Sequence, residues 1–383
     1  MWLSASSACR AREPNESPVQ EAMSERRLTG AECIQVFRIP RFPCGRSDFR
    51  SARTILSAVW ISYCDVLFDG FSAMSAGLRF RRILVTGRDR ARFLHNFCTN
   101  VVRDLPEGRS VEAFFVDVKA RVLAHGYVLA LPSRHEIHVL GAVGAEAALV
   151  KHLDRYIITE DVQVRSVSEE QQGQFWWWPD DGSERLSVGC VELAGEGVRH
   201  VFRWTGGVQC VLAGEPQVVA VEVANLAGGG RAATDEQLLG CRIAERFPVV
   251  GVDISGEQLA PEVDRNSEAI SYQKGCYLGQ EPIARIDAMG HINRALRRVD
   301  LSGVAAGSGE AWSGAELRAV DGAVLGRLTS VLVPAGGKSG AGVGLAIVRL
   351  SGVPVEAVRG DGVRCVVERV VGRDVLSGAG EAV

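Results

Sequence analysis

The sequence predicts an α+β fold in which antiparallel strands alternate with packed helices. Short apolar runs recur between residues 82 and 167, and two segments among them have the apolar spacing of helices. After residue 293 the pattern changes to short β-rich runs separated by Gly, Ser and Pro, which is typical of a small barrel or sandwich. We therefore expect an α+β module, a boundary near residues 294–300, and a small β domain after it.

Each element follows from its own pattern of apolar residues. Phe93, Leu94 and Phe97 share one face of the first predicted helix. Asp235 is the predicted N-cap of a later helix. Strands are predicted over residues 82–86, 111–117, 121–131, 136–140, 162–167, 295–301, 324–332, 343–348 and 362–371. Helices are predicted over residues 89–97, 145–156 and 235–247.

Composition excludes several classes of protein. With 383 residues, 46% hydrophobic and 23% charged, the chain falls in the ordinary soluble globular class. A net charge of −3 gives no field for stable nucleic-acid binding. The longest apolar run, 54–64, is shorter than the ~18 residues of a membrane span, so no membrane association is expected.

Cysteine usage and the first residues bear on the compartment. Ten cysteines without any Cys-x-x-Cys pair argue against a zinc site and a disulfide scaffold. The cytoplasm fits best, or the mitochondrial matrix if the organism is eukaryotic. Residues 1–70 are rich in Arg and Ser with poor periodicity, so we expect a poorly structured extension, or a true start further along, for which Met74 is one candidate.

The octapeptide Lys274–Glu281 is the most informative motif. Cys276 lies two residues after Lys274 and just ahead of a helix start predicted at Glu281, with Pro282 near the first helical position. A nearby cation and free helical N–H groups both favour the thiolate, which attacks electrophiles and binds metals. Cys276 and Lys274 are therefore the candidate catalytic residues, and Cys276 the candidate metal ligand. The alternative is a small buried hydrophobe.

The rest of the octapeptide suits a polar ligand. Gly275 and Gly279 allow a positive φ and close approach of the backbone to a ligand. Gln280 and Glu281 supply an amide and a carboxylate able to bind a polar heterocycle.

This octapeptide, with the residues around it, resembles the signature of the YgfZ family. That family comprises folate-binding, iron–sulfur-cluster-assembly proteins related to the T-protein (aminomethyltransferase, GcvT) of the glycine cleavage system. The resemblance covers roughly residues 75–370. The segments that carry it, in family order, are Gly87–His95, Cys98–Asn100, Asp117–Arg121, Leu239–Pro248, Ala269–Arg285 and Gly290–Arg294.

The resemblance implies a GcvT/YgfZ-like folate-binding module over residues 75–295 and a C-terminal β-barrel domain over 296–375. A tetrahydrofolate-type ligand would occupy the central pocket of the module, with Cys276 near its mouth as a redox-active thiol or the transient ligand of an iron–sulfur cluster. Lys274 would hold the thiolate or an anionic ligand. Cluster-assembly or recipient proteins would be the partners.

The resemblance also implies residues for the folate ligand. Tyr277 would offer a flat face to the pterin ring, beside Gly279, Gln280 and Glu281. Arg285 would meet the folate glutamate tail or form a solvated salt bridge, and Arg242 is a second candidate for that tail. The pocket rim would comprise Asp117, Lys119 and Arg121, although exposed turns carry such charges routinely; Ala120 replaces the usual Gly of that turn.

The T-protein depends on an Asp in the strand after this turn, where the chain has Ala124 and His125. Aminomethyl transfer is therefore disfavoured, and an accessory role in assembly or repair of iron–sulfur clusters is expected. Two alternatives stay open. One is a tetrahydrofolate-dependent, aminomethyltransferase-like enzyme. The other is a cysteine enzyme in which His291 serves Cys276 as a base.

Overall fold

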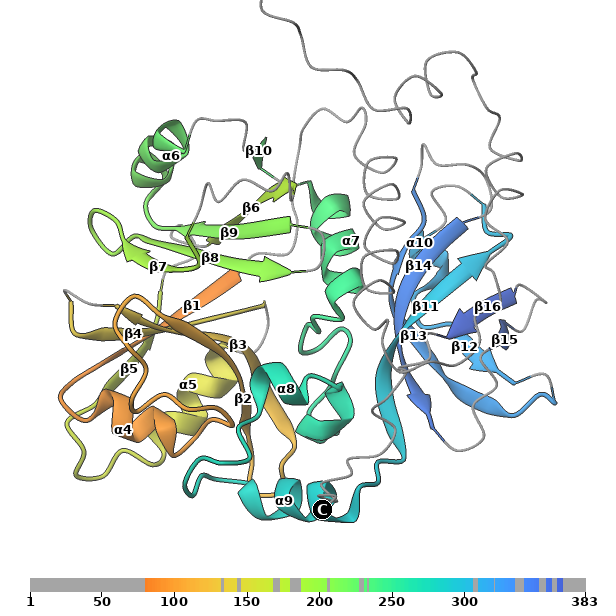
Figure 1. The fold of residues 1–383 in the computed structure, drawn as a ribbon, viewed down its shortest axis with the longest axis horizontal. Helices are drawn as coiled ribbons and strands as arrows, with labels where there is room; N and C mark the ends of the chain where they lie inside the picture. The colour runs from red at the N-terminus through yellow and green to blue at the C-terminus, as the bar shows by residue number, and fades with distance from the viewer. Residues whose placement is uncertain are drawn as a thin grey trace, which may run out of the picture. The chain divides into compact units, whose positions relative to one another are not determined.

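A computed structural model shows how the chain folds (Figure 1). The expected extension over residues 1–70 lies outside the described residues. No helix in the part that is described is both long and apolar enough to cross a membrane. The structure describes residues 80–131, 134–142, 146–167, 173–179, 187–204, 207–226, 231–232, 234–305, 309–319, 321–334, 341–350, 356–359 and 364–367.

Ten antiparallel strands form one sheet in the first module. Its path runs β2-β3-β4-β1-β6-β9-β8-β7, while β5 pairs with β1 and β10 with β6. The β2-β3-β4-β1 part of the sheet joins the β6-β9-β8-β7 part where Phe80 of β1 pairs with Gly173 of β6. The strands are β1 (Phe80–Thr86), β2 (Ser110–Val116), β3 (Val122–Leu131), β4 (Glu136–Ala142), β5 (Gln163–Ser166), β6 (Gly173–Pro179), β7 (Gly189–Glu192), β8 (Val198–Trp204), β9 (Gly207–Ala213) and β10 (Arg231–Ala232).

Helices cover this sheet, as the periodicity predicts. In α4 (Arg90–His95) and α5 (Glu146–Asp154), Phe93, Leu94 and Leu149 are buried in one cluster with residues of the sheet. Both helices are shorter than predicted. The expected helix over 235–247 is α7 (Asp235–Glu245), and α6 (Pro216–Asn225) precedes it.

The predicted N-cap of α7 is wrong by one residue. Thr234, not Asp235, is the cap: its hydroxyl accepts a hydrogen bond from the Gln237 N–H at 3.2 Å, and the Gln237 side chain accepts from the Thr234 N–H at 2.9 Å. This reciprocal capping box satisfies two N–H groups at once, so Asp235 becomes the first helical residue.

Three short elements follow α7 and lead to the cysteine loop. They are a 3₁₀-helix, η2 (Ala260–Val263), then α8 (Asn266–Ala269), then α9 (Gln280–Met289). Helix α9 begins one residue before the predicted position, after Gly279 with φ of +79°.

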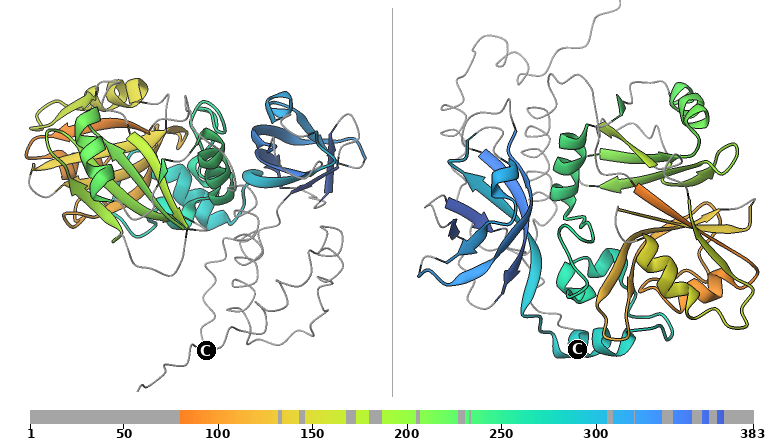
Figure 2. Two further views of the ribbon diagram at one scale, coloured as in Figure 1. Left: turned by 90° about the horizontal axis from the view of Figure 1, so that it is seen from above. Right: turned by 180° about the vertical axis from the view of Figure 1, so that it is seen from behind.

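The C-terminal strands pair in the order β11-β14-β13-β12-β15-β16, and β16 pairs back to β11, so the ladder closes on itself (Figure 2). Val299, Leu317, Leu328 and Val348 fill its interior. Of the predicted strand 362–371, residues 362–363 and 368–371 lie outside the described part. The elements are β11 (Arg294–Ser302), α10 (Gly309–Trp312), β12 (Glu316–Arg318), β13 (Val324–Leu332), β14 (Ala341–Arg349), β15 (Glu356–Arg359) and β16 (Arg364–Val367).

Candidate functional site

The cysteine loop, residues 271–279, connects α8 to α9 and is fixed at both ends to the segment that follows α4. The Ser271 N–H donates to the Thr99 carbonyl at 2.9 Å, and the Leu278 N–H donates to the Asn96 carbonyl at 2.9 Å. The Thr99 hydroxyl donates to the Ala269 carbonyl at 2.6 Å. Contacts between two regions that lie 170 or more positions apart in the sequence therefore hold the loop in place.

Lys274 is the central anchor of this loop. Its ammonium donates to the backbone carbonyls of His95 at 2.7 Å, Cys98 at 2.6 Å and Asn100 at 2.8 Å. The side chain is buried, and burial lowers the pKa of Lys274. Because an ammonium has three N–H donors, these carbonyls occupy all of them.

This geometry corrects two predicted roles. Lys274 is directed at the carbonyls rather than at the thiol of Cys276, because three oxygens compensate its burial better than one exposed sulfur. Tyr277 is 8% exposed and packs in a hydrophobic cluster, with the Lys274 ammonium 4.8 Å from its ring centroid. Its ring is therefore part of the core, not an open face for a pterin.

Cys276 itself is exposed. The other cysteines whose side chains the structure describes are buried: Cys98, Cys190, Cys210 and Cys241. Burial raises the pKa of the Cys190 and Cys210 thiols to about 12 and that of Cys98 in the same direction. Cys276 is thus the exposed thiol among these five cysteines, and its reactivity stays a prediction. No group of three or more His, Cys, Asp or Glu residues placed to hold a metal occurs within that region.

The turn Asp117–Arg121 lies against the end of the cysteine loop. The Asp117 carboxylate accepts from the N–H groups of Lys119 at 2.8 Å and Arg121 at 2.9 Å, so Asp117 orders the turn. Ala120 adopts a φ of +63°, the conformation that explains the glycine usual in the family. The side chains of Lys119 and Arg121 are exposed.

Gly279 brings the two motifs into contact. A Cβ atom at residue 279 would overlap the Asp117 carbonyl oxygen and lie 2.8 Å from Cγ2 of Val116. Figure 1 shows α9 beside the connection between β2 and β3. The close approach that Gly279 allows is therefore to the protein's own backbone, which corrects the expectation of a bound ligand there.

The remaining octapeptide candidates lie on α9. Gln280 is half-buried, while Glu281 and Arg285 are exposed. Neither Glu281 nor Arg285 has an ion-pair partner within the described residues. Both remain candidates for contact with a ligand or partner.

Arg242, in contrast, is a structural residue. The residue is 3% exposed, and its guanidinium forms an ion pair with Asp253 and donates to the Phe247 carbonyl at 3.1 Å and the Ser330 hydroxyl at 2.5 Å. Asp253 also accepts from Thr329 at 2.8 Å. The network links α7 to β13, so the predicted contact between Arg242 and a folate tail is not supported: its N–H groups are turned inward.

A buried ion pair in the module interior was not predicted. Glu112 of β2 pairs with Arg265, whose Nη2 lies 2.7 Å from Oε2, and with His125, whose Nε2 lies 2.7 Å from Oε1. Burial opposes ionisation of Glu112, but Arg265 and His125 outweigh it and lower the pKa of the carboxyl to about 2. The sequence signal is a single carboxylate inside the apolar run Val111–Val116.

Aromatic rings surround this ion pair. Tyr127 stacks on Phe247 with centroids 5.7 Å apart, and the Trp204 indole N–H donates to the Tyr127 hydroxyl at 2.9 Å. His200 bonds Ser110 at 2.8 Å. Three buried nitrogens nearby have no hydrogen-bond partner among the described residues: Nδ1 of His125, Nδ1 of His200 and Nε2 of Gln209.

Comparison with known proteins agrees with the motifs, although no protein-family profile matches the chain. The chain is 26% identical over 285 residues to a putative chloroplastic transferase of Arabidopsis thaliana, covering 69% of this chain and 62% of that protein. It is 24% identical over 236 residues to the tRNA-modifying protein YgfZ of Colwellia psychrerythraea, covering 57% of this chain and 68% of that one.

Among solved structures, the glycine cleavage system aminomethyltransferase T of Bartonella henselae matches with a TM-score of 0.60 at 15% identity, covering 76% of this chain and 83% of that chain. This match shows a GcvT-like α+β fold. Together the similarities support a YgfZ/GcvT-like family assignment, which confirms the resemblance seen in the motifs. The chain spans less than two thirds of the chloroplastic relative.

Proposed function

We propose that this protein binds a tetrahydrofolate-type ligand and acts as an accessory factor in the assembly or repair of iron–sulfur clusters, with Cys276 as its reactive group. The observation that carries the proposal is an exposed thiol on a loop that Lys274 and Gly279 fix in place. A thiol held in one position and open to solvent can meet a metal or a disulfide carried by another protein.

Cys276 supplies one sulfur. A cluster held there transiently would take its other ligands from a cluster-assembly or recipient protein. Glu281 and Arg285, exposed on α9, are placed to contact that protein or the ligand. Lys274 acts indirectly, as a positioning residue for the loop.

The module interior supports the folate part of the proposal. The rings of His125 and His200, whose Nδ1 atoms have no hydrogen-bond partner among the described residues, contact Phe247 and Tyr127, and this combination of ring nitrogens and aromatic faces would suit a pteridine. Lys119 and Arg121, exposed beside the cysteine loop, suit the carboxylates of such a ligand.

Domain assignment and compartment belong to the same proposal. Residues 75–295 form the folate-binding module, and 296–375 correspond to the family's C-terminal β-barrel domain. The cytoplasm is the proposed compartment, or the mitochondrial matrix in a eukaryote; the chloroplastic relative from Arabidopsis makes an organelle a further candidate.

The experiment is complementation of a strain that lacks its own family member, with [4Fe–4S] enzyme activity as the readout. Wild-type protein is expected to restore activity, whereas Cys276→Ala and Cys276→Ser are not. Equal rescue by all three would remove the thiol from the mechanism. Tetrahydrofolate binding, measured separately by calorimetry, should persist in Cys276→Ala, so that the two halves of the proposal fail independently.

A folate-dependent aminomethyltransferase is the second candidate, supported by the GcvT-like fold. The buried carboxylate of Glu112 argues against this candidate. Glu112 has a pKa near 2 and both of its oxygens bind Arg265 or His125, so it is a weak base at neutral pH. Methylene-tetrahydrofolate formed at enzyme-like rates from an aminomethyl or methylamine donor would favour this candidate instead.

The third candidate is a cysteine enzyme with His291 as base. His291 is exposed, and its Nε2 bonds the Asn293 side chain at 3.0 Å. An unaltered rate of Cys276 alkylation in His291→Ala would count against this pairing.

A further inference from the structure

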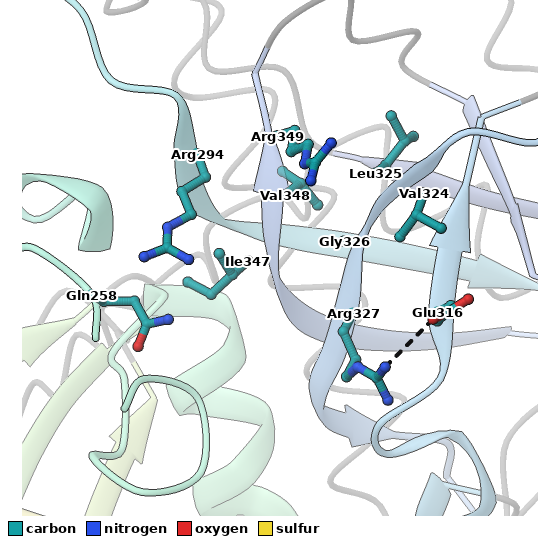
Figure 3. Close-up of a pocket in the computed structure, with 10 residues that line it drawn as sticks. All are labelled: Gln258, Arg294, Glu316, Val324, Leu325, Gly326, Arg327, Ile347, Val348 and Arg349. Atoms are coloured by element: carbon teal, nitrogen blue, oxygen red, sulfur yellow. Dashed lines mark hydrogen bonds and ion pairs between the residues drawn. The ribbon is translucent and has the colours of Figure 1, made fainter. Parts of the chain in front are cut away.

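A groove of about 310 Å³ lies on the outer face of the β11-β14-β13 ladder, next to the loop that carries Gln258 (Figure 3). Its rim includes Arg294, Arg327 and Arg349, and Ile347 lies between them. No residue of the cysteine loop lines it.

Strand register places these arginines on one face. Arg294 of β11 is the direct partner of Arg349 of β14, and Arg327 of β13 is the direct partner of Ile347, two residues before Arg349. Residues directly opposite in a ladder, and residues two apart on a strand, share a face. Like charges directly opposite each other are destabilising, so the Arg294–Arg349 pair needs compensation.

The positive charge of two of the three arginines is compensated by protein groups. Arg294 pairs with Glu262 at 2.9 Å and donates to the Glu257 carbonyl at 3.1 Å. Arg327 donates to the Gly314 carbonyl at 2.9 Å and lies 3.5 Å from the Glu316 carboxylate. Arg349 is exposed and has no hydrogen-bond or ion-pair partner among the described residues.

Gln258 adds a neutral donor. Its side-chain oxygen accepts from the N–H and the hydroxyl of Ser255, at 2.5 and 2.8 Å. Its amide N–H groups are left for the groove, where Figure 3 shows the side chain next to Arg294 and across from Arg327.

We propose that this groove binds a small polyanion, a molecule with at least two carboxylate or phosphate groups. Arg349 is its principal contact, Arg327 and Gln258 are the flanking donors, and Ile347 provides an apolar floor. Because Glu262 already compensates Arg294, an anion there would compensate the charge of Arg349 and form charge-assisted hydrogen bonds with its guanidinium. This site is separate from the proposed chemistry of Cys276 and stands without it.

Calorimetric titration of the full chain at low ionic strength tests the site, with tricarballylate as the carboxylate probe and pyrophosphate as the phosphate probe. Wild-type protein should bind at least one probe, which identifies the preferred class. Arg349→Gln should weaken that binding by about tenfold or more. Arg92→Gln, the same charge change at an exposed position on α4, should bind as wild type does.

A second measurement distinguishes a binding residue from a structural one. Without any anion, Arg349→Gln should leave the unfolding temperature unchanged or raise it, because it removes a like-charge pair. At a probe concentration that saturates wild-type protein, wild type should gain stability and the variant should gain clearly less. Absence of binding by both probes, equal binding by Arg349→Gln, or a lower unfolding temperature of that variant without anion would each overturn the proposal.

Discussion

Gly279 lies so close to the backbone carbonyl of Asp117 that no side chain fits between them. Its φ of +79° belongs to the left-handed region that glycine adopts most easily. The contact joins the turn after β2 to the start of α9, and it sets where the loop carrying Cys276 ends. A contact between two backbone segments therefore fixes the end of the loop that carries Cys276.

Replacing Gly279 by alanine should disturb this junction. The left-handed conformation alone costs about 1–2 kcal/mol for an L-residue, and overlap with Asp117 adds to it, so we expect at least about 2 kcal/mol less stability. Urea unfolding measures the loss. Gly275→Ala is the matched control, because a Cβ there meets no atom within 4 Å; equal stability of the two variants would contradict this account.

Lys274→Met should release the cysteine loop. Removal of the ammonium leaves the carbonyls of His95, Cys98 and Asn100 without their donor, and an unsatisfied buried polar group costs about 1–3 kcal/mol. We expect a loss of several kcal/mol and faster amide exchange at Ser271 and Leu278. Hydrogen exchange measured by mass spectrometry checks the predicted loss of amide protection. Protection equal to wild type would show that Lys274 is not the anchor.

Thiol reactivity should differ sharply along the chain. In the native protein, iodoacetamide should modify Cys276 readily and spare Cys98, Cys190, Cys210 and Cys241, which are buried. Peptide mapping after short exposure measures each site separately. Modification of Cys210 or Cys241 as fast as that of Cys276 would refute the assignment; in urea all of these sites should react.

The Glu112–Arg265 pair predicts acid sensitivity. Because the pKa of Glu112 falls from an ordinary 4.5 to about 2, its stabilising effect is complete above pH 4.5 and is lost as the pH falls toward 2. Glu112→Gln should lower neutral-pH stability by about 3–5 kcal/mol, since Arg265 stays buried without its counter-charge. It should also flatten the acid dependence.

Urea unfolding between pH 3 and 7 compares wild type with Glu112→Gln. Glu316→Gln is a suitable control, because Glu316 is a half-exposed partner of Arg318 and Arg327. A variant whose stability falls with acid as steeply as that of wild type would locate the sensitivity elsewhere, for example in His200, whose pKa burial lowers to about 3.

Much of the fold is encoded in local pattern. Apolar pattern predicted the strands from β1 to β5 and the helices α4, α5 and α7, because most of these elements bury apolar side chains in the core of the module. Strands β6 to β9 were not predicted. The N-cap of α7 differed by one residue because Thr234 and Gln237 form a reciprocal pair that neither residue reveals alone.

Some features of the candidate site could likewise be predicted from the sequence, and others could not. The distinctive Cys276, the start of α9 to within one residue, and the family resemblance were all accessible from the sequence, whereas the exposure of the thiol was not. The roles of Lys274, Tyr277 and Arg242 were not, because adjacency in sequence does not fix the direction of a side chain. Lys274 is two residues from Cys276, yet its partners lie on a segment more than 170 positions away.

The sequence by itself determined an α+β chain with one distinctive cysteine loop and a strand after the Asp117 turn that lacks the expected Asp. Only the tertiary structure decided that Lys274 anchors this loop, that Glu112 pairs with Arg265 from 153 positions away, and that three arginines share one face of the C-terminal ladder. The reason is physical. Periodicity records which residues are buried, but the partner that compensates a buried charge is chosen by proximity in space.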